Sequence, residues 1–242
     1  MRAHGLTAAA GLLAAGAGLS VMAAFLVGQT PTTPPSDATL AISAEAATPL
    51  LSLPDAPRVL IFGGSYTYGI GASAPEQGFA YKLAENEGWD AVIDGVPGTG
   101  YLDPGPHRTG AYPARMAELD ADETFDLIII QGSTHDFAMD HSRLPAAVTA
   151  TLAAANKNFP GTPIVMLGPV TYGGSPERIS VNSQLARAAA ANDTIYLSPV
   201  DGDWYTAGDR ATLRDEATGK PNDTGHQALA ERLGRSVTAL TS

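Results

Sequence analysis

Short apolar runs recur along the chain from about residue 58 onward. Residues 58–62 read Arg-Val-Leu-Ile-Phe and residues 126–131 read Asp-Leu-Ile-Ile-Ile-Gln. Such continuous runs are typical of strands that are buried on both faces of a parallel sheet. Residues 91–93, 163–167 and 194–197 supply three further runs, and the spacing leaves room for a helix between each pair. The pattern therefore predicts five strands that alternate with helices.

The segments between these runs show helical spacing. Ser175 followed by Pro176 and Glu177 is a helix start signal, because the serine can cap the helix and the proline fits its first turn. Apolar residues recur every three or four positions, as Leu144, Val148, Leu152 and Ala155 in one segment and as Leu229, Leu233, Val237 and Leu240 in another. We therefore expect helices in both segments.

Alternating strands and helices predict an α/β fold, a three-layer doubly wound domain with a five-stranded parallel sheet over residues 58–242. Right-handed crossovers place the loop after each strand at the carboxyl edge of the sheet, where such folds bind ligands. Ser65, Gly98, Gly132 and Gly168 lie in these loops. Any active site is therefore expected at that edge.

The N-terminal residues predict a membrane anchor. Arg2 and His4 precede residues 5–28, which contain no charged residue. At about 1.5 Å per residue this stretch is long enough to cross a bilayer core of roughly 30 Å. Residues 1–28 thus predict a single-pass signal anchor, and residues 29–57 a Pro-, Thr- and Ala-rich linker to an extracytoplasmic domain. Cleavage as a signal peptide, which would release the domain as a secreted protein, is the alternative.

Charge and composition exclude several classes of partner. The net charge is −11, so we expect no nucleic-acid binding. The chain has no cysteine, which excludes disulfides, thiolate metal sites and cysteine nucleophiles. An acidic segment around Asp201, Asp209 and Asp215 has irregular spacing and predicts a solvated loop, so neither a metal nor a cofactor is expected.

A serine-bearing turn follows the first predicted strand. Gly63 and Gly64 precede Ser65 and permit a sharp turn that leaves the hydroxyl at a helix N-terminus. Backbone N–H groups at such a terminus can stabilise an oxyanion. Glycine-rich turns also follow the second and third strands, at residues 95–101 and 132–136, and a further turn at residues 221–226 opens the last helix.

With these turns in this order, residues 58–240 resemble the SGNH or GDSL-type ester hydrolases, in particular their secreted bacterial branch. The resemblance implies that Ser65 is the nucleophile and also donates its backbone N–H to the oxyanion hole. Gly98 matches the second donor, and His135 stands where the family has an asparagine as the third donor. Gly64 replaces the aspartate of the first motif.

The chain departs from the family at the catalytic base. The family's Asp-x-x-His precedes Pro-Asn, and the same alignment places Ala217 and Lys220 at these two positions. A second Asp-x-x-His, Asp223 to His226, follows. Three alternatives stay open: His226 with Asp223 is the base, Lys220 is the base, or Ser65 has no efficient base.

Two functions are compatible with this pattern. The first is a serine esterase that hydrolyses a small-molecule, glycan or lipid acyl ester of the cell envelope. The second is a catalytically impaired protein that keeps the cleft to bind a glycan or a protein at the cell surface. A flavodoxin-like cofactor module is disfavoured, because the turn after the first strand lacks the glycine pattern of a dinucleotide site.

Overall fold

The computed structural model describes residues 50–107 and 109–241, which contain one five-stranded sheet. Every pair of neighbouring strands is parallel, and the order across the sheet is β2-β1-β3-β4-β5. The strands are β1 (Arg58–Gly63), β2 (Asp90–Gly95), β3 (Leu127–Gln131), β4 (Ile164–Leu167) and β5 (Ile195–Leu197). The predicted α/β fold with its five-stranded parallel sheet is confirmed.

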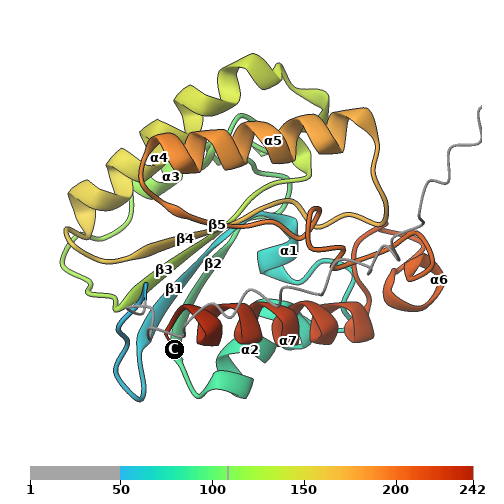
Figure 1. The fold of residues 1–242 in the computed structure, drawn as a ribbon, viewed down its shortest axis with the longest axis horizontal. Coiled ribbons are helices and arrows are strands. Elements are labelled where there is room, and N and C mark those ends of the chain that lie inside the picture. The colour runs from blue at the N-terminus through green and yellow to red at the C-terminus, as the bar shows by residue number, and fades with distance from the viewer. Residues whose placement is uncertain (1–49, 108, 242) are drawn as a thin grey trace, which may run out of the picture. The chain divides into compact units, whose positions relative to one another are not determined.

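Helices cover both faces of the sheet (Figure 1). The α-helices are α1 (Ser65–Tyr68), α2 (Phe79–Glu87), α3 (Tyr112–Ala117), α4 (Leu144–Asn158), α5 (Pro176–Ala191), α6 (Arg210–Leu213) and α7 (Asp223–Leu240), and short 3₁₀ turns span Pro75–Gln77, His135–Ala138 and His141–Arg143. Figure 1 shows α3, α4 and α5 on one face, and α2 and α7 on the other. This arrangement is the three-layer architecture expected from the sequence.

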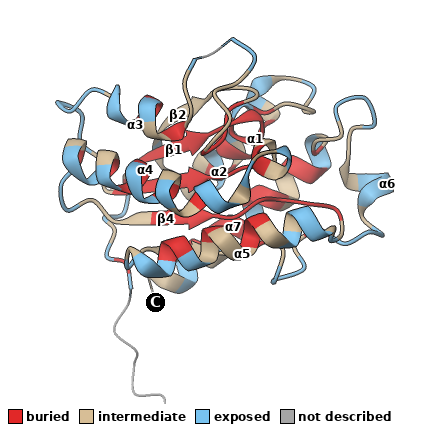
Figure 2. Cartoon of the chain, turned by 90° about the horizontal axis from the view of Figure 1, so that it is seen from above, coloured by how far each residue is buried: buried red, intermediate tan, exposed pale blue. Residues whose placement is uncertain are grey.

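Alternate residues of each strand point to opposite faces and build two apolar cores. In β1, Val59 and Ile61 pack against the side of α2 and α7, whereas Leu60 and Phe62 pack against the side of α3, α4 and α5. All four side chains are at most 1% exposed. Burial on both faces explains the continuous apolar runs, and Figure 2 shows the strands buried between helices whose outer faces are exposed.

Polar side chains cap the starts of two helices, at Ser175 as predicted from the sequence and also at Asn222. The Ser175 hydroxyl accepts the Arg178 N–H at the start of α5. The Asn222 side chain accepts the Gly225 N–H at 2.9 Å and begins α7. These bonds satisfy backbone donors that have no partner within the helix.

The folded part begins before residue 58. Leu51 is 3% exposed, packs in the core beside α7, and donates its N–H to the Leu240 carbonyl at 2.9 Å. The last residues of the predicted linker therefore belong to the folded domain. The predicted anchor lies outside the described residues, and so does most of the linker, so the anchor, the membrane location and an envelope substrate stay predictions. Within residues 50–107 and 109–241, no helix combines the length and apolarity needed to cross a bilayer.

The strand order places three turns next to each other. β1 lies between β2 and β3, so the strand order reverses at β1: β2 is added on one side of it and β3 on the other. Open α/β sheets bind ligands at such a point. Ser65 follows β1, Gly98 follows β2 and His135 follows β3. The sheet therefore brings three of the predicted site residues to one point of its carboxyl edge.

Candidate active site

Ser65 is the first residue of α1, directly after the turn that ends β1. The preceding Gly64 has no room for a side chain, because a Cβ there would lie 2.5 Å from the Thr99 carbonyl oxygen. This close approach gives a physical reason for glycine where the family has aspartate. The close approach of Gly64 and Thr99 also places the loop after β2 against the turn that carries Ser65.

Gly98 places a backbone donor on the serine hydroxyl. Its N–H donates to Ser65 Oγ at 3.0 Å. The residue has a φ of +85°, and a Cβ would lie 2.5 Å from Pro106 Cδ, so both conformation and space require glycine. The predicted second oxyanion donor thus lies beside the nucleophile.

His135 contacts the same hydroxyl from the turn after β3. Its Nε2 lies 2.8 Å from Ser65 Oγ. Ser65 is only 5% exposed, and its Oγ already accepts the Gly98 N–H. Within the part of the chain that the structure describes, the His135 ring is the one side chain hydrogen-bonded to the serine hydroxyl, and the tautomer of the ring decides which of the two donates.

The surroundings of His135 favour the neutral imidazole. Burial lowers its pKa first, the positive charge of Lys220 lowers it further, and the Asp103 carboxylate acts in the opposite direction. A neutral imidazole has one nitrogen with a free lone pair. With the ring hydrogen on Nδ1, Nε2 accepts the Ser65 hydroxyl, which is the arrangement that a general base requires.

A buried carboxylate fixes the turn that carries His135. Asp136 is fully buried and accepts the N–H groups of Tyr101 and Leu102, both at 2.9 Å, and of Asp103 at 3.3 Å. These bonds tie the turn after β3 to the loop after β2. Burial raises the pKa of Asp136, and these bonds oppose the rise. No role of Asp136 was predicted from the sequence, although its position directly after His135 was a signal that could have identified it.

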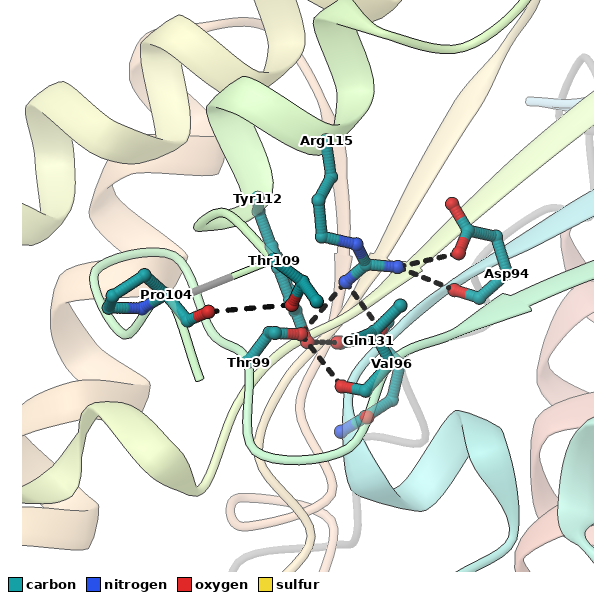
Figure 3. A network of polar contacts seen from close by, with 9 residues as sticks. Asp94, Val96, Thr99, Pro104, Thr109, Tyr112, Arg115 and Gln131 are labelled. Atoms are coloured by element: carbon teal, nitrogen blue, oxygen red, sulfur yellow. Dashed lines mark hydrogen bonds and ion pairs between the residues drawn. The ribbon is translucent and has the colours of Figure 1, made fainter. Parts of the chain in front are cut away.

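Arg115 joins the two turns that carry Ser65 and Gly98 (Figure 3). Its guanidinium donates to the Gly63 carbonyl and the Thr99 hydroxyl, both at 2.8 Å. It also donates to the Asp94 carbonyl at 3.0 Å and forms an ion pair with the Asp94 carboxylate at 2.7 Å. A single arginine in α3 gives no sequence signal for this role, because all of its partners are distant in sequence.

His226 is not positioned as the base for Ser65. The side chain is fully buried, and its Nδ1 accepts the Phe79 N–H at 3.1 Å. Nε2 lies 3.2 Å from the Ile70 carbonyl and must therefore carry the hydrogen. With its one lone pair occupied, the neutral ring has no acceptor for a serine proton. Burial lowers the pKa of His226, which agrees with a neutral structural residue.

Asp223 does not assist His226 as the predicted pair required. Its two carboxylate oxygens accept the N–H and the hydroxyl of Ser73, both at 2.7 Å. The Ser73 bonds lower the pKa of Asp223. This carboxylate therefore anchors the loop before α2 to the start of α7, and the Asp223–His226 hypothesis for the base is corrected by the geometry.

Lys220 lies in the wall of the cavity beside His135. Its Nζ donates to the Thr134 hydroxyl at 2.8 Å and lies 5.0 Å from the centroid of the Tyr66 ring. Burial lowers the pKa of Lys220 to about 8. The depression that a lysine base needs is thus partly present, but the ammonium is hydrogen-bonded to Thr134 and not to Ser65.

A cavity of about 300 Å³ opens at this edge of the sheet. Its wall includes Tyr66, His135 and Lys220, so it adjoins the Ser65–His135 contact. Within the described ranges, no cluster of three or more histidine or acidic side chains that could hold a metal ion occurs. Asp209 and Asp215, from the acidic segment, accept hydrogen bonds from nearby threonines.

Several solved structures share this fold at low sequence identity. A protein from Lactobacillus plantarum is 18% identical with a TM-score of 0.64, over 77% of this chain and 98% of that one. A carbohydrate acetylesterase from Sinorhizobium meliloti is 16% identical with a TM-score of 0.57, over 76% and 99%. An aryl esterase from M. smegmatis is 14% identical with a TM-score of 0.56, over 76% and 100%.

Sequence comparison identifies the family directly. Among curated proteins, no sequence matches the chain significantly. The sequence profile of the GDSL-like lipase/acylhydrolase family matches residues 61–228. This range contains the nucleophile turn, all five strands beyond the first residues of β1, and the start of α7. The chain therefore belongs to the GDSL-like lipase/acylhydrolase family of SGNH-type ester hydrolases.

Proposed function

We propose that the protein hydrolyses acyl esters with Ser65 as the nucleophile and His135 as the general base. The observation that carries this proposal is the 2.8 Å contact between Ser65 Oγ and His135 Nε2. A serine hydroxyl is a weak nucleophile unless a neighbouring group takes its proton. His135 therefore has the role of base rather than that of the third oxyanion donor, which its alignment with the family's asparagine implied.

The first half of the reaction forms an acyl-enzyme. Ser65 Oγ bonds to the ester carbonyl carbon while its proton moves to His135 Nε2, and the carbonyl electron pair moves to oxygen. The tetrahedral intermediate then collapses: the bond from carbon to the alcohol oxygen breaks, and the imidazolium returns the proton to the leaving alcohol. Burial and the Lys220 charge disfavour the imidazolium and lower the pKa of His135, and the Asp103 carboxylate acts against them.

The oxyanion is stabilised by backbone donors. The Ser65 N–H lies at the start of α1, and the Gly98 N–H already reaches the serine hydroxyl at 3.0 Å. Donors fixed in this way stabilise the charge that develops in the transition state. In the second half of the reaction His135 takes a proton from water while the water oxygen bonds to the acyl carbon, and the carbonyl electron pair again moves to oxygen. The bond from carbon to Ser65 Oγ then breaks and the imidazolium gives its proton to Ser65 Oγ, which releases the acid and restores the serine.

The similar structures support a small acyl ester as the substrate. They include a carbohydrate acetylesterase and an aryl esterase. The impaired binding protein, which the sequence left open, was motivated by the loss of a base at Ala217 and Lys220. If His135, in the turn after β3, serves as the base, the loss at Ala217 and Lys220 no longer argues for an impaired protein. The binding protein is still one possible outcome of the following experiment.

The test compares hydrolysis of 4-nitrophenyl esters by the full-length protein and three variants. Ser65→Ala is expected to lose at least about 10³-fold in kcat, because the nucleophile is absent. His135→Ala is expected to lose about 10²- to 10⁴-fold, as removal of a general base does. His135→Asn supplies the amide donor that the family has at this position but no base, so its loss should match that of His135→Ala.

His226→Asn is the matched control, because it makes the same substitution at the other histidine. Its kcat is expected within a few-fold of the unchanged protein. Full activity of His135→Asn would make His135 an oxyanion donor and overturn the base assignment. Equal rates for the unchanged protein and Ser65→Ala would overturn the enzyme and favour the binding protein.

A further inference from the structure

The cavity beside Ser65 is strongly cationic in a protein that is otherwise acidic. Its wall contains Arg178, Arg210, Arg214 and Lys220, and no aspartate or glutamate. The whole chain has 25 acidic and 14 basic residues, so a wall with this balance opposes the overall charge of −11. Such a concentration of positive charge attracts and orients an anionic ligand.

The four cations have no ion-pair partner within residues 50–107 and 109–241. Ion pairs in these ranges use Arg58, Lys82 and Arg115, none of which lines the cavity. Glu177 and Asp215 are close enough to Arg178 and Arg214 for the charges to interact, but neither acid forms an ion pair with them or lines the cavity. Two of the four cations thus have a carboxylate nearby, but within the described residues none of the four is held in an ion pair.

Neutral acceptors hold three of the cations in place. Arg210 donates to the Tyr172 carbonyl at 3.0 Å, and Arg178 donates to the Gly173 carbonyl at 3.1 Å. Lys220 donates to the Thr134 hydroxyl. Each of these bonds fixes a cation without using a negative charge. Remaining N–H groups are available to a ligand, since guanidinium has five donors and ammonium has three.

The cationic cavity adjoins the Ser65–His135 contact through His135. His135, which contacts the serine hydroxyl, lies in its wall together with the cations, and Phe137 and Val170 add apolar surface. We propose that the ester substrate carries an anionic group, a carboxylate, phosphate or sulfate, which the cations of this cavity bind while the ester carbonyl lies at Ser65. Planar guanidinium groups suit such oxyanions because they can donate two parallel hydrogen bonds. This inference rests on the esterase function proposed above.

Matched ester pairs test the preference and locate the charge. On the acyl side, the 4-nitrophenyl monoester of glutaric acid is compared with 4-nitrophenyl valerate. On the alcohol side, 4-acetoxybenzoate, 4-acetoxyphenyl phosphate and 4-acetoxyphenyl sulfate are compared with methyl 4-acetoxybenzoate. We expect kcat/KM to be at least about 10-fold higher for an anionic ester than for its neutral partner, on one of the two sides. The ester with the highest kcat/KM shows whether the cavity prefers a carboxylate, a phosphate or a sulfate on the substrate.

Variants assign the preference to the cavity. Arg214→Gln and Arg178→Gln are each expected to lower the ratio of anionic to neutral kcat/KM about 10-fold. Arg187→Gln is the control, because this arginine lies on the same helix as Arg178 but is exposed and outside the cavity. Its ratio should equal that of the unchanged protein. Ratios near one for every pair, with a Ser65-dependent rate on the neutral esters, would overturn the anionic substrate and leave the esterase intact.

Binding separates this inference from the esterase proposal. Calorimetry on Ser65→Ala with glutarate, phosphate or sulfate measures anion affinity without turnover. Binding that weakens about 10-fold in Ser65→Ala/Arg214→Gln would support the anion site even if no ester were hydrolysed. Absence of saturable binding of all three anions, together with ratios near one, would reject it.

Discussion

Two regions meet at the carboxyl edge of the sheet, and each contains a histidine. In the nucleophile turns, residues 63–65, 98–100 and 132–136, backbone and ring groups converge on the Ser65 hydroxyl. In the C-terminal segment, residues 213–226, polar side chains bond to the backbone: His226 accepts the Phe79 N–H, and Asn222 accepts the Gly225 N–H. Burial lowers the pKa of both histidines. The two histidines differ in what their ring nitrogens contact: Nε2 of His135 reaches the Ser65 hydroxyl, whereas Nδ1 of His226 accepts the Phe79 N–H.

The same contrast explains how the family's base can be absent from its usual segment. Lys220, which aligns with the family's histidine, forms part of the cavity wall. The turn after β3 supplies an imidazole to the hydroxyl instead. Proton transfer needs a lone pair within hydrogen-bond distance and does not depend on which strand provides it. If His135 is the base, as proposed, the base has changed its place in the sequence while the serine of the first turn has stayed.

The largest effect on stability is expected when Arg115, which joins the turns of the first region, is replaced. Arg115→Met removes the guanidinium that bonds to the Gly63 and Asp94 carbonyls and to the Thr99 hydroxyl. Removing one partner of a buried, hydrogen-bonded pair lowers the free energy of unfolding by about 3–5 kcal/mol. Urea denaturation measures this loss. We also expect a lower kcat in the folded variant, because the turns that hold Ser65 and Gly98 are no longer joined.

Arg187→Met is the control for this experiment, since the Arg187 side chain is exposed. It should change neither the stability nor kcat appreciably. A stability loss below about 1 kcal/mol for Arg115→Met would show that the network adds little to the fold. An unchanged kcat in the folded variant would show that it does not position the nucleophile.

A smaller effect, of a different kind, is expected in the second region. His226→Asn leaves the buried Phe79 N–H without its imidazole acceptor, at a cost of about 1–3 kcal/mol in the free energy of unfolding. The rate at saturating substrate should stay within a few-fold. Thermal and urea denaturation, measured alongside kcat, test the contrast with His135→Asn. A His226→Asn variant that is as stable as the unchanged protein but has a large loss of kcat would show that His226 takes part in catalysis.

The fold was predictable from the sequence because its signals are local. Continuous apolar runs such as residues 126–131 belong to strands buried on both faces, and Ser175 with Pro176 marks the beginning of α5. The positions of Ser65 and Gly98 follow from the strand ends. Each of these features depends on neighbouring residues or on the general rule for parallel sheets.

The proposed base and the cavity were not predictable, because both depend on contacts between distant segments. His226 is engaged by Phe79, which lies 147 residues earlier in the chain. Arg115 reaches the Gly63 carbonyl, 52 residues away. The cavity cations come from α5, α6 and the residues that follow α6. The sequence offered His226 and Lys220 as candidates for the base and His135 as an oxyanion donor, and only their packing shows which ring nitrogen reaches Ser65.

The pH dependence of the rate sharpens the comparison further. Since burial lowers the pKa of His135, we expect kcat/KM for a neutral ester to reach its plateau with a midpoint below the ordinary value of about 6.5. Below that midpoint the rate should fall about tenfold per pH unit, because the protonated base is inactive. The residual rate of His135→Asn should not show this fall at low pH. A midpoint above pH 7 would contradict a base desolvated in this way.

A fall in pH is also expected to lower the stability of the fold, as it lowers the rate. Both His135 and His226 have folded-state pKa values below the unfolded value, so the unfolded state binds more protons as the pH falls below about 6.5. Their contribution to stability is present above that pH and is lost as the pH falls through the folded pKa. Circular dichroism at each pH therefore has to accompany the rates. His226→Asn should weaken the pH dependence of stability and leave the fall of the rate at low pH in place.

The smallest effect concerns Lys220 and anionic esters at high pH. Burial raises the pKa of Tyr66 and Tyr172 and lowers that of Lys220, so between pH 7 and 9 we expect the charge of the cavity wall to change at Lys220. Its pKa of about 8 predicts that the wall loses one positive charge across this interval. The ratio of anionic to neutral kcat/KM should therefore fall a few-fold between pH 7 and 9. Lys220→Met should begin at the lower ratio and stay there, and a ratio in the unchanged protein that is flat across this interval would place the anionic group out of reach of Lys220.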